Sequence, residues 1–487
     1  MADDRHIPCR LHCRPVRSTA SFDALSEVFA RRPSATILGA NPSVADAAGF
    51  SYWAAEPRET FELTAEQTDP FSILSEAMRK YRLTEEDACS TQTDVPPSAM
   101  FHGGWIGYFS YELGRHIERL PGKARDDLSL PLIRLCFYDR FLACDHRSGL
   151  FWIVAMELPD DREAPKEKLA SLEERLRFAE RTRLRELPHA CMEDTDLADV
   201  RRNMTHRSYL EAVGRIKQYI RDGDVYQVNF SHRLELPFQG DPIRLFHWQS
   251  RHNPSGYAAY IDAGGFQIVS ASPEMFVTVR DGSIRTKPIK GTRPRIDDSR
   301  PGASLLNAER FRELLASEKE QAELHMIIDL ERNDVARICK PGTRRVVQPR
   351  TIEAYPTVYH AVATIAGDLR EDLAFTDILK AMFPGGSITG APKIRAMEII
   401  DELEPTARGV YTGAIGFVGL DRTASLNIAI RTIIINRRRA FVQAGGGIVA
   451  DSDPQAEWDE SIVKARALLA GIRAVEMECV ERDAAGR

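Results

Sequence analysis

Two pairs of glutamates stand at helical spacing in the second half of the chain. Glu320 and Glu323 are three residues apart in one stretch with helical periodicity, and Glu457 and Glu460 have the same spacing in another. Side chains three apart project from one face of a helix, so two such faces could meet on one Mg²⁺ ion, which prefers oxygen ligands. Most glutamates at this spacing are solvated, however, and Glu460 with Lys464 also has the spacing of a surface salt bridge.

Two glycine-rich segments offer backbone N–H groups to an anion. AGGGIVADSDP contains the three successive glycines Gly445, Gly446 and Gly447, and FPGGSITGAPK leads into an expected helix. Bare N–H groups can form a concave anion site, and the N-terminus of a helix favours negative charge. Neither segment matches the phosphate-binding loop or the dinucleotide fingerprint, so the expected anion is a carboxylate rather than a nucleotide. Three glycines in a row are also common in tight turns and bulges.

Lys290 lies in the basic segment KPIKGTRPR. Its neighbours Lys287, Arg293 and Arg295 would lower its pKa if they lay close to it, because a like charge disfavours the ammonium form. An amine with a lowered pKa is a nucleophile near neutral pH. Without such surroundings, Lys290 is an ordinary solvated lysine.

The segment ASLNIAIRTIII predicts one β-strand with two distinct faces. The alternation puts Leu426, Ile428 and Ile430 on one face and Asn427, Ala429 and Arg431 on the other. On that second face Arg431 could hold a carboxylate through two parallel hydrogen bonds. An arginine that simply points outward from a sheet is the commoner case.

Helices and strands are expected around these residues. Helical periodicity covers residues 209–221 and 305–330, and two further helices are expected to begin at Pro392 and Pro454, because proline is favoured in the first turn. A run rich in Val and Phe predicts a strand at residues 275–280. The chain is therefore expected to mix α and β structure.

Length and composition indicate a large globular protein. The chain has 487 residues, of which 43% are apolar, and a formal charge of −6. Because Lys and Arg form no basic block, nucleic acid is not an expected partner. The chain starts without the apolar stretch of a secretory signal, its apolar runs are too short to span a bilayer, and its eight cysteines are scattered. A cytoplasmic location with reduced thiols and no membrane contact is therefore expected.

A change in composition suggests a domain boundary near residue 200. Dense charge before that point predicts a solvated helix or helical linker over residues 163–186. The expected organisation is an N-terminal domain over residues 1–200 that ends in this linker, a catalytic domain over residues 201–475 and a C-terminal tail over residues 476–487.

The motifs, in their order, resemble the chorismate-utilising enzymes, which include the anthranilate synthase large subunit, aminodeoxychorismate synthase component I, and the isochorismate and salicylate synthases. The resemblance is carried by SASPEMF, PIKGTRPR, AELHMIIDLERND, FPGGSITGAPKIRAME, GVYTGAIGF, LNIAIRT and AGGGIVADSDPQAEWDESIVKA. GGWIGYFSYE extends it more weakly into the N-terminal half. The resemblance implies an α+β fold like that of anthranilate synthase component I, with antiparallel β-sheets in a sandwich flanked by helices.

The resemblance also implies roles for individual residues. Glu323 and Glu460 would bind Mg²⁺, with Glu320 and Glu457 in support, and the metal would hold the ring carboxylate of chorismate. The positions that match substrate-binding residues of the family are Ser387, Thr389, Tyr411, Arg431, Gly445, Gly446, Gly447 and Lys464. Glu274 matches the acid that helps to expel the 4-hydroxyl group. His360 in TVYHAVATIAG matches an active-site histidine, and the alternative is a buried histidine bonded to a neighbouring backbone group.

Two positions distinguish the members of this family. Lys290 fills a place where anthranilate synthases typically carry alanine in a PIAGT motif, whereas PIKGT is typical of aminodeoxychorismate synthases. In those enzymes the lysine attacks C2 of the ring as the 4-hydroxyl leaves, and ammonia then adds at C4. Gln227 stands where isochorismate and salicylate synthases place the lysine that activates water. Chorismate and ammonia are thus the expected substrates, and 4-amino-4-deoxychorismate, on the route to 4-aminobenzoate and folate, is the expected product.

Ammonia is expected to come from a partner protein. No cysteine of the chain has a glycine neighbour, so the Gly-x-Cys-x-Gly nucleophile of a class I glutaminase is absent. A separate glutamine amidotransferase subunit is therefore implied. An anthranilate synthase large subunit is the nearest alternative, and a non-catalytic, chorismate-binding regulatory subunit is an alternative of another class.

Overall fold

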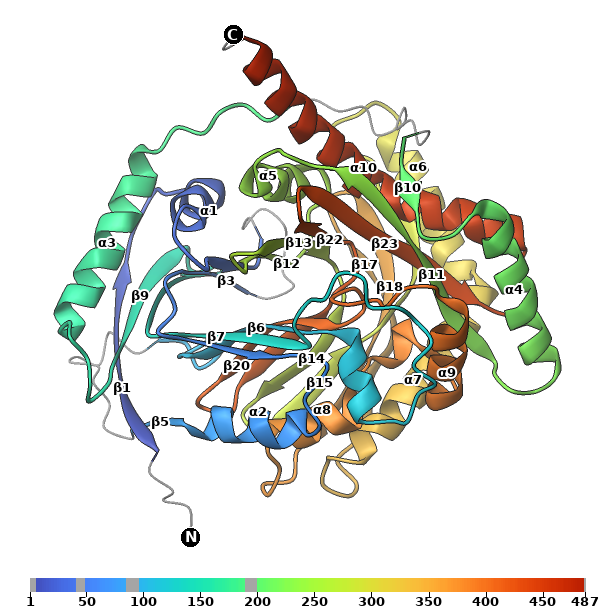
Figure 1. Cartoon of the computed structure of the whole chain (residues 1–487), viewed down its shortest axis with the longest axis horizontal. Helices are drawn as coiled ribbons and strands as arrows, with labels where there is room; N and C mark the ends of the chain where they lie inside the picture. The colour runs from blue at the N-terminus through green and yellow to red at the C-terminus, as the bar shows by residue number, and fades with distance from the viewer. Residues whose placement is uncertain (1–5, 41–48, 85–95, 189–198, 486–487) are drawn as a thin grey trace.

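Two β-sheets packed face to face organise the chain (Figure 1). The computed structural model describes residues 6–40, 49–84, 96–188 and 199–485. Paired strands run antiparallel in both sheets except for β1 and β5, which are parallel. The helices pack on the outer faces of the two sheets. The expected α+β fold with antiparallel sheets and flanking helices is confirmed.

The larger sheet has thirteen strands in the order β10-β11-β23-β22-β13-β12-β2-β3-β8-β9-β1-β5, with β19 beside β11. Its strands are β1 (Ile7–Val16), β2 (Thr36–Leu38), β3 (Phe50–Ala54), β5 (Tyr81–Leu83), β8 (Arg140–Asp145), β9 (Leu150–Glu157), β10 (Arg201–Arg202), β11 (Gln227–Pro237), β12 (Tyr257–Asp262), β13 (Phe266–Ser272), β19 (Gly390–Ala391), β22 (Thr432–Asn436) and β23 (Arg439–Ile448).

The smaller sheet has ten strands in the order β16-β18-β15-β14-β21-β20-β6-β7-β4, with β17 beside β18. Its strands are β4 (Glu59–Leu63), β6 (Gly104–Phe109), β7 (Ile133–Tyr138), β14 (Met275–Arg280), β15 (Ser283–Lys287), β16 (Ile289–Pro294), β17 (Arg345–Ala354), β18 (Val358–Asp368), β20 (Ala414–Gly419) and β21 (Ala424–Ile428).

The helices are α1 (Phe22–Ala30), α2 (Pro70–Arg79), α3 (Pro165–Arg181), α4 (His206–Arg221), α5 (Pro242–His252), α6 (Ala303–Ala316), α7 (Glu318–Ala336), α8 (Phe375–Met382), α9 (Lys393–Leu403) and α10 (Pro454–Ala485). Two short 3₁₀ turns are η1 (Tyr111–His116) and η2 (Gly386–Ile388). As expected from the sequence, Pro392 is the N-cap of α9 and α10 begins at Pro454.

The period of two along β6 divides its side chains between two apolar cores. In β6, Ile106 and Tyr108 lie in the core between the sheets, whereas Trp105 and Phe109 lie in the core under the helices of the smaller sheet. Alternate side chains of a strand point to opposite faces of its sheet, so β6 needs apolar residues at every position. A third core joins α1, α3, α5 and α10 to the outer face of the larger sheet.

Both sheets include strands from either side of residue 200. β6 pairs with β20 in the smaller sheet, and β2 pairs with β12 in the larger one. The two halves of the chain therefore share continuous ladders of hydrogen bonds. The division into domains at residue 200 stays a prediction. α10 runs to Ala485 and so includes most of the segment predicted as a tail.

The segment ASLNIAIRTIII does not form the single strand that its alternation predicts. β21 belongs to the smaller sheet and β22 to the larger one, and the residues between them cross from one sheet to the other. Arg431 adopts a positive φ of 51° at this crossing. The alternation also fails to separate buried from exposed positions, because Leu426 and Asn427 are both buried. Both faces of β21 are covered, which a local pattern does not reveal.

The helix expected over residues 305–330 is two helices. α6 ends and α7 begins at Ser317, whose hydroxyl accepts a hydrogen bond from Glu320 N. Serine is favoured as an N-cap because its side-chain oxygen satisfies a free backbone N–H group. Helical periodicity continues across this boundary, so the sequence pattern did not reveal that a second helix begins there.

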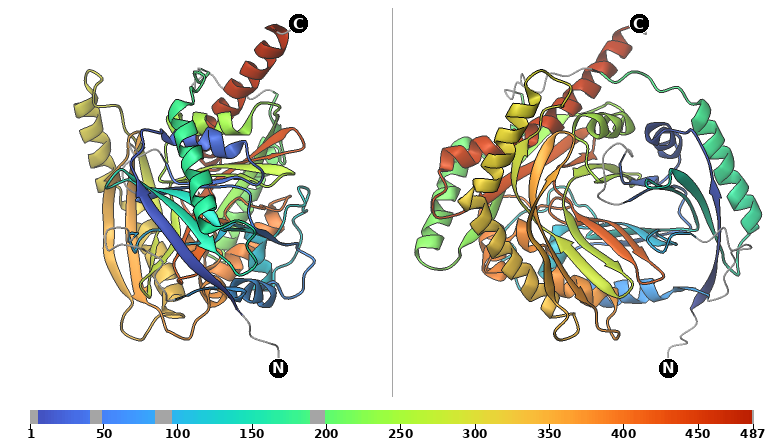
Figure 2. Two further views of the ribbon diagram at one scale, coloured as in Figure 1. Left: turned by 90° about the vertical axis from the view of Figure 1, so that its left-hand side faces the viewer. Right: turned by 180° about the vertical axis from the view of Figure 1, so that it is seen from behind.

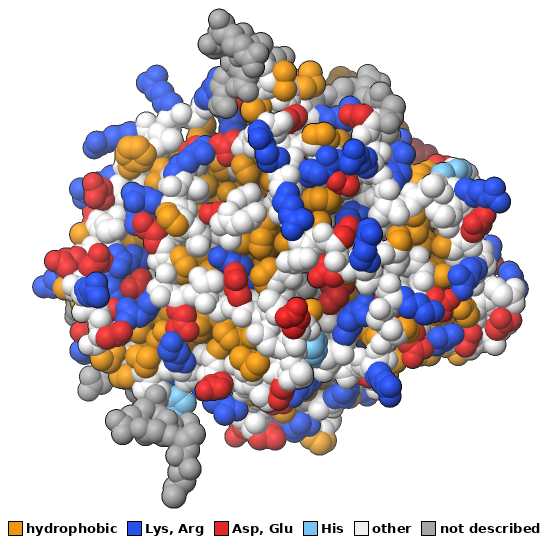
Figure 3. Space-filling model, viewed as in Figure 1, with side chains coloured by type: hydrophobic (Ala, Val, Ile, Leu, Met, Phe, Trp, Pro, Cys, Tyr) orange, Lys and Arg blue, Asp and Glu red, His pale blue; other side chains and the backbone are white. Residues whose placement is uncertain are grey.

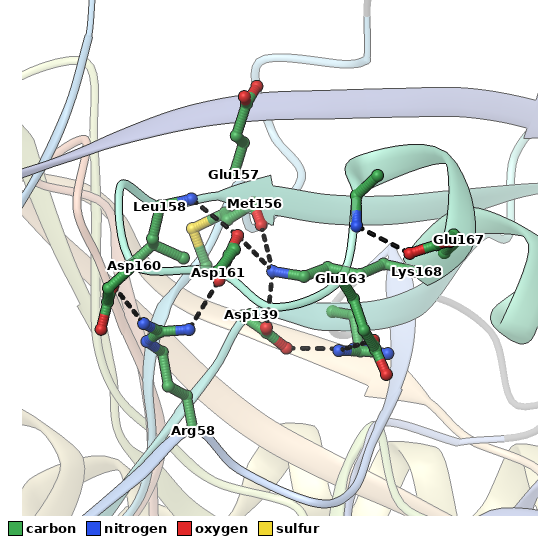
Figure 4. A network of polar contacts seen from close by, with 12 residues as sticks. Arg58, Asp139, Met156, Glu157, Leu158, Asp160, Asp161, Glu163, Glu167 and Lys168 are labelled. Carbon is green, nitrogen blue, oxygen red and sulfur yellow. Dashed lines mark hydrogen bonds and ion pairs between the residues drawn. The ribbon is translucent and has the colours of Figure 1, made fainter.

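α3, the helix expected in the charged segment, is anchored by a buried lysine (Figure 4). Lys168 is 1% exposed, and its Nζ lies 2.7 Å from both Asp139 Oδ2 and Asp161 Oδ2. It also donates to Met156 O at 2.8 Å. The turned views of Figure 2 show α3 lying along the outside of the larger sheet. One face of this helix is therefore packed, although its sequence is mostly charged.

The surface carries both signs of charge without a single dominant patch on the face seen in Figure 1. Figure 3 shows Lys and Arg side chains interspersed with Asp and Glu over that face. Among the described helices, none combines the length with the apolar character that a bilayer crossing requires.

Replacing Lys168 with methionine should lower the free energy of unfolding by about 3–5 kcal/mol, because two buried carboxylates would lose their cation. Urea unfolding followed by circular dichroism measures the change. Lys166→Met on the exposed side of α3 is the matched control and should shift stability by no more than about 0.5 kcal/mol. Equal shifts in the two variants would contradict the anchoring role of Lys168.

Candidate active site

α7 and α10 carry the two glutamate pairs, and carboxylates of the two helices are near enough to interact. Burial raises the pKa of Glu323, and the negative charge of Glu460 raises it further. Burial also raises the pKa of Glu457, which accepts a hydrogen bond of 2.6 Å from Ser452 Oγ. Against the effect of burial, Lys464, whose Nζ lies 2.7 Å from Glu460 Oε1, holds the pKa of Glu460 below its usual value.

One carboxylate oxygen of Glu320 forms an ion pair, and the other has no hydrogen-bond partner among the described residues. Its Oε1 lies 2.8 Å from Arg293 Nη1, whereas its Oε2 is buried and has no hydrogen-bond partner in the described part of the chain. Within the described ranges, no three His, Cys, Asp or Glu side chains form a group that could hold a metal ion. The carboxylates of the two helices thus influence one another without forming a closed cage in the described part of the chain.

The three successive glycines lie in a regular strand. Gly445 to Gly447 are part of β23, paired with β11, so the tight turn or bulge considered from the sequence is wrong. β22 pairs with β23 only between Asn436 and Ile433, so on that side the glycines have no paired strand among the described residues. A Cβ atom on Gly446 would lie 3.2 Å from Glu457 Oε2 and 3.4 Å from Lys464 Nζ. The glycine backbone therefore adjoins the charged side chains of α10.

Ser387 forms hydrogen bonds with both Glu274, which could act as an acid, and Lys290, which could act as a nucleophile. Its Oγ donates to Glu274 Oε1 at 2.6 Å, and its carbonyl oxygen accepts from Lys290 Nζ at 3.1 Å. Burial raises the pKa of Glu274 and lowers the pKa of Lys290. Both shifts favour the neutral forms, namely a carboxylic acid that can donate a proton and an amine that can attack carbon.

The cause of the lowered pKa at Lys290 differs from the one expected. Burial is the main cause, and Lys464 is the cation that adds to it. The basic neighbours in sequence are ion-paired, Lys287 with Glu353, Arg293 with Glu320 and Arg295 with Asp298. The proposed lowering by these three residues is therefore wrong, because each charge is compensated by its own carboxylate.

Arg431, Tyr411 and His360 lie near the crossing between the sheets. Arg431 donates a hydrogen bond to the backbone oxygen of Lys464. Burial raises the pKa of Tyr411 to about 12, against the effect of Arg431. Burial, and then the charge of Arg431, lowers the pKa of His360 to about 4, so this imidazole is neutral at pH 7. Its Nδ1 lies 2.9 Å from Thr292 Oγ1, a side-chain partner instead of the backbone group considered as the alternative.

Two further residues singled out in the sequence are buried at the edge of this cluster. The hydroxyl of Thr389 donates to Gly385 O at 3.0 Å and so bonds within its own turn. Gln227 is 1% exposed, and neither polar atom of its side chain has a partner in the described part of the chain. A Cβ atom on Gly447 would lie 1.9 Å from Gln227 Nε2, so a larger residue there would require this amide to move.

The ion pair of Glu404 with Arg408 was not predicted from the sequence. Arg408 Nη2 lies 2.7 Å from Glu404 Oε1, both side chains are 1% exposed, and the guanidinium lies over the ring of Tyr411 at 5.9 Å. Opposite charges four residues apart in ELEPTAR were the available signal. Such pairs are usually exposed, so their spacing alone gave no reason to single them out.

A cavity of about 560 Å³ opens elsewhere, between β3, β14, β15 and β21. Its lining includes Tyr52, Tyr257, Arg280, Arg285 and Phe417 and none of the candidate site residues. The candidate site is therefore defined by its chemistry and not by this cavity.

Comparisons with known proteins point to one family. A family model described as chorismate binding enzyme matches residues 43–470. Aminodeoxychorismate synthase component 1 of Bacillus subtilis is 39% identical over 381 residues, which are 78% of this chain and 78% of the relative. Anthranilate synthase component 1 of Pseudomonas putida is 38% identical over 417 residues, 84% of this chain and 80% of the relative. Anthranilate synthase component I of Streptococcus pneumoniae superposes with a TM-score of 0.72 at 30% identity, covering 87% of this chain and 93% of that structure.

Gly445→Ala should disrupt the strand beside α10. The new Cβ would lie 2.0 Å from the backbone oxygen of Phe230, so we expect a loss of about 1–3 kcal/mol in stability, as for overpacking. Gly214→Ala in α4 is the control, because nothing lies within 4 Å of that position and alanine is the better helix former. Urea unfolding of both variants tests this, and an unchanged midpoint for Gly445→Ala would contradict it.

Proposed function

We propose, because the chain belongs to the family of chorismate-binding enzymes, that it acts as an aminodeoxychorismate synthase component I. The relatives include anthranilate synthases at similar identity, so overall similarity does not choose between the two activities. The observation that carries the choice is Lys290, a half-buried amine with a lowered pKa whose Nζ shares Ser387 with Glu274.

The proposed reaction proceeds in two displacements on chorismate. The amine of Lys290 forms a bond to C2 as the bond from C4 to its hydroxyl breaks, and Glu274 donates the proton with which that hydroxyl leaves as water. Ammonia then forms a bond at C4 while the bond from C2 to Lys290 breaks. The balance is chorismate and ammonia to 4-amino-4-deoxychorismate and water, with Glu274 reprotonated for the next cycle.

The carboxylates of α7 and α10 fit a hard divalent cation. Glu323 and Glu460 would hold Mg²⁺, with Glu320 and Glu457 in support, because the unsatisfied oxygen of Glu320 and the raised pKa of Glu323 both call for a positive charge. Mg²⁺ commonly takes one or two protein carboxylates and completes its shell with water and substrate oxygens. When bound, the ion would neutralise the ring carboxylate of chorismate.

Other residues of the site would bind and orient the substrate. Arg431, Tyr411 and Lys464 supply positive or hydroxyl groups for its carboxylates, beside the open backbone edge of β23. His360 would act as a neutral imidazole, because its pKa of about 4 leaves it uncharged at pH 7. Ammonia would come from a separate glutamine amidotransferase subunit, since the sequence has no glutaminase nucleophile.

Glu323→Gln should weaken Mg²⁺ binding and reduce kcat/KM by about two orders of magnitude, because a neutral amide replaces a carboxylate ligand. Calorimetric titration with Mg²⁺ gives the affinity, and turnover with excess Mg²⁺ gives the kinetic effect. Glu318→Gln, which alters an exposed side chain in the first turn of the same helix, should change neither. Normal Mg²⁺ affinity in Glu323→Gln would refute the metal assignment.

Identification of the product tests the proposed activity. With chorismate, ammonium and Mg²⁺, the isolated chain should form 4-amino-4-deoxychorismate, whereas glutamine should not replace ammonium. Lys290→Ala should reduce this product by about a hundredfold or more, as for loss of a positioned catalytic group. Without ammonia, peptide mass spectrometry of the wild type should show a ring adduct on the peptide with Lys290.

Three outcomes would count against the proposal. Fluorescent anthranilate as the product would make the chain an anthranilate synthase, which its relatives of that name also support. Undiminished 4-amino product from Lys290→Ala would remove the covalent step. A folded chain that binds chorismate and is inert with ammonium and Mg²⁺ would favour the regulatory subunit.

A further inference from the structure

Glu331 is a buried acid directly behind the turn that holds Lys290 and Glu274. It lies on α7 and is 3% exposed, and Thr286 Oγ1 donates to its Oε2 at 2.9 Å. The turn adjoins it, because a Cβ atom on Gly386 would be in van der Waals contact with Glu331 Cγ at 3.7 Å. The proposed reaction assigns this carboxyl group no part.

The charges facing Glu331 come from four elements or their ends. The titratable groups are Glu274 before β14, Lys290 on β16, Asp334 on α7 and Lys393 on α9. Lys393 is already paired with Asp334 at 2.5 Å, so Glu331 has no cation of its own among the described residues. Burial, with the charges of Glu274 and Asp334, raises the pKa of Glu331 to about 8 against the effects of Thr286 and Lys393. The group therefore holds its proton at pH 7.

We propose, on the basis of the proposed function, that Glu331 is a positioning residue that must be uncharged for Lys290 to act as a nucleophile. In its neutral form it packs beside Gly386 in the turn that includes Ser387, accepts a hydrogen bond from Thr286, and adds no charge to the site. As an anion it stabilises the ammonium form of Lys290, because an opposite charge in a buried site favours the charged state. Ionisation of Glu331 above pH 8 thus lowers the fraction of Lys290 that is present as the free amine.

Glu331 changes the pKa of Lys290 only at a pH where Glu331 is ionised. Below about pH 7 Glu331 is neutral and does not affect the pKa of Lys290, which burial lowers. As the pH rises through about 8, the new negative charge raises the pKa of Lys290, so its free amine increases less steeply than for an isolated group. Glutamine at position 331 keeps an oxygen for the Thr286 hydroxyl and cannot ionise, so it removes only the charge.

Competitive labelling of Lys290 measures this linkage without turnover. The intact chain is treated with a trace of acetic anhydride between pH 6 and pH 10, and peptide mass spectrometry gives the acetylation rate of Lys290. At pH 9 we expect Lys290 to react about threefold or more faster in Glu331→Gln than in the wild type, which equals a shift of about half a pKa unit. Below pH 7 the two rates should agree.

The control is Asp329→Asn, which removes one negative charge from the exposed side of the same helix. Its Lys290 profile should match that of the wild type, since solvent screens the exposed charge. Coincident profiles for Glu331→Gln and the wild type at pH 9 would overturn the proposal, as would a change of equal size below pH 7, which signals a rearranged turn. Both results are independent of the product formed, so the activity could be correct while this role of Glu331 fails.

Discussion

The buried ion pair of Glu404 and Arg408 connects the parts of the candidate site. Arg408 donates to Ile388 O in the η2 turn and to Asn229 O in β11, while Glu404 accepts from both the backbone and the hydroxyl of Ser231. Ser231 pairs with Gly445, so the same two charges touch the strand of glycines and the turn that holds Ser387. A buried pair of this kind adds little net stability but strongly penalises any arrangement that separates its partners. The relative positions of the turn, the glycine strand and Tyr411 depend on it.

Around this fixed point, burial sets the protonation of the groups that would react. Glu274, Lys290 and His360 come from different strands or their ends, and each is driven toward its uncharged form by loss of water. The carboxylates proposed to share a cation are instead gathered on α7 and α10 with Lys464, and Arg431 lies at the crossing between the sheets. In the proposed reaction, this separation of neutral reactive groups from charged binding groups would let one site hold a dianionic substrate and still offer a free amine.

The sequence predicted those helices and strands that are determined by interactions between residues close together in the chain. The helix starting at Pro454 and the strand at residues 275–280 follow from proline at the first turn and from runs of apolar residues, and the structure has both. The crossing at Arg431 was not predictable, because alternation does not tell which of two sheets a residue joins. The surroundings of Lys290 were equally hidden, since Ser387, Glu274 and Lys464 reach it only through the fold, whereas the basic residues adjacent in sequence are bound to other carboxylates. The family resemblance brought these distant residues together, because motif order carries tertiary information that spacing lacks.

β23 lies inside the larger sheet, between β11 and β22, although it comes last in the sequence among the described strands. During translation, the facing edges of β11 and β22 remain unpaired until residues 439–448 have left the ribosome. Open strand edges readily pair with other chains, and distant pairings form slowly. The edge of β11 therefore stays open while residues 238–438 are made, whereas β22 ends at Asn436 and waits only for the next strand. The ladder between β11 and β23 is completed only after nearly all of the chain has emerged.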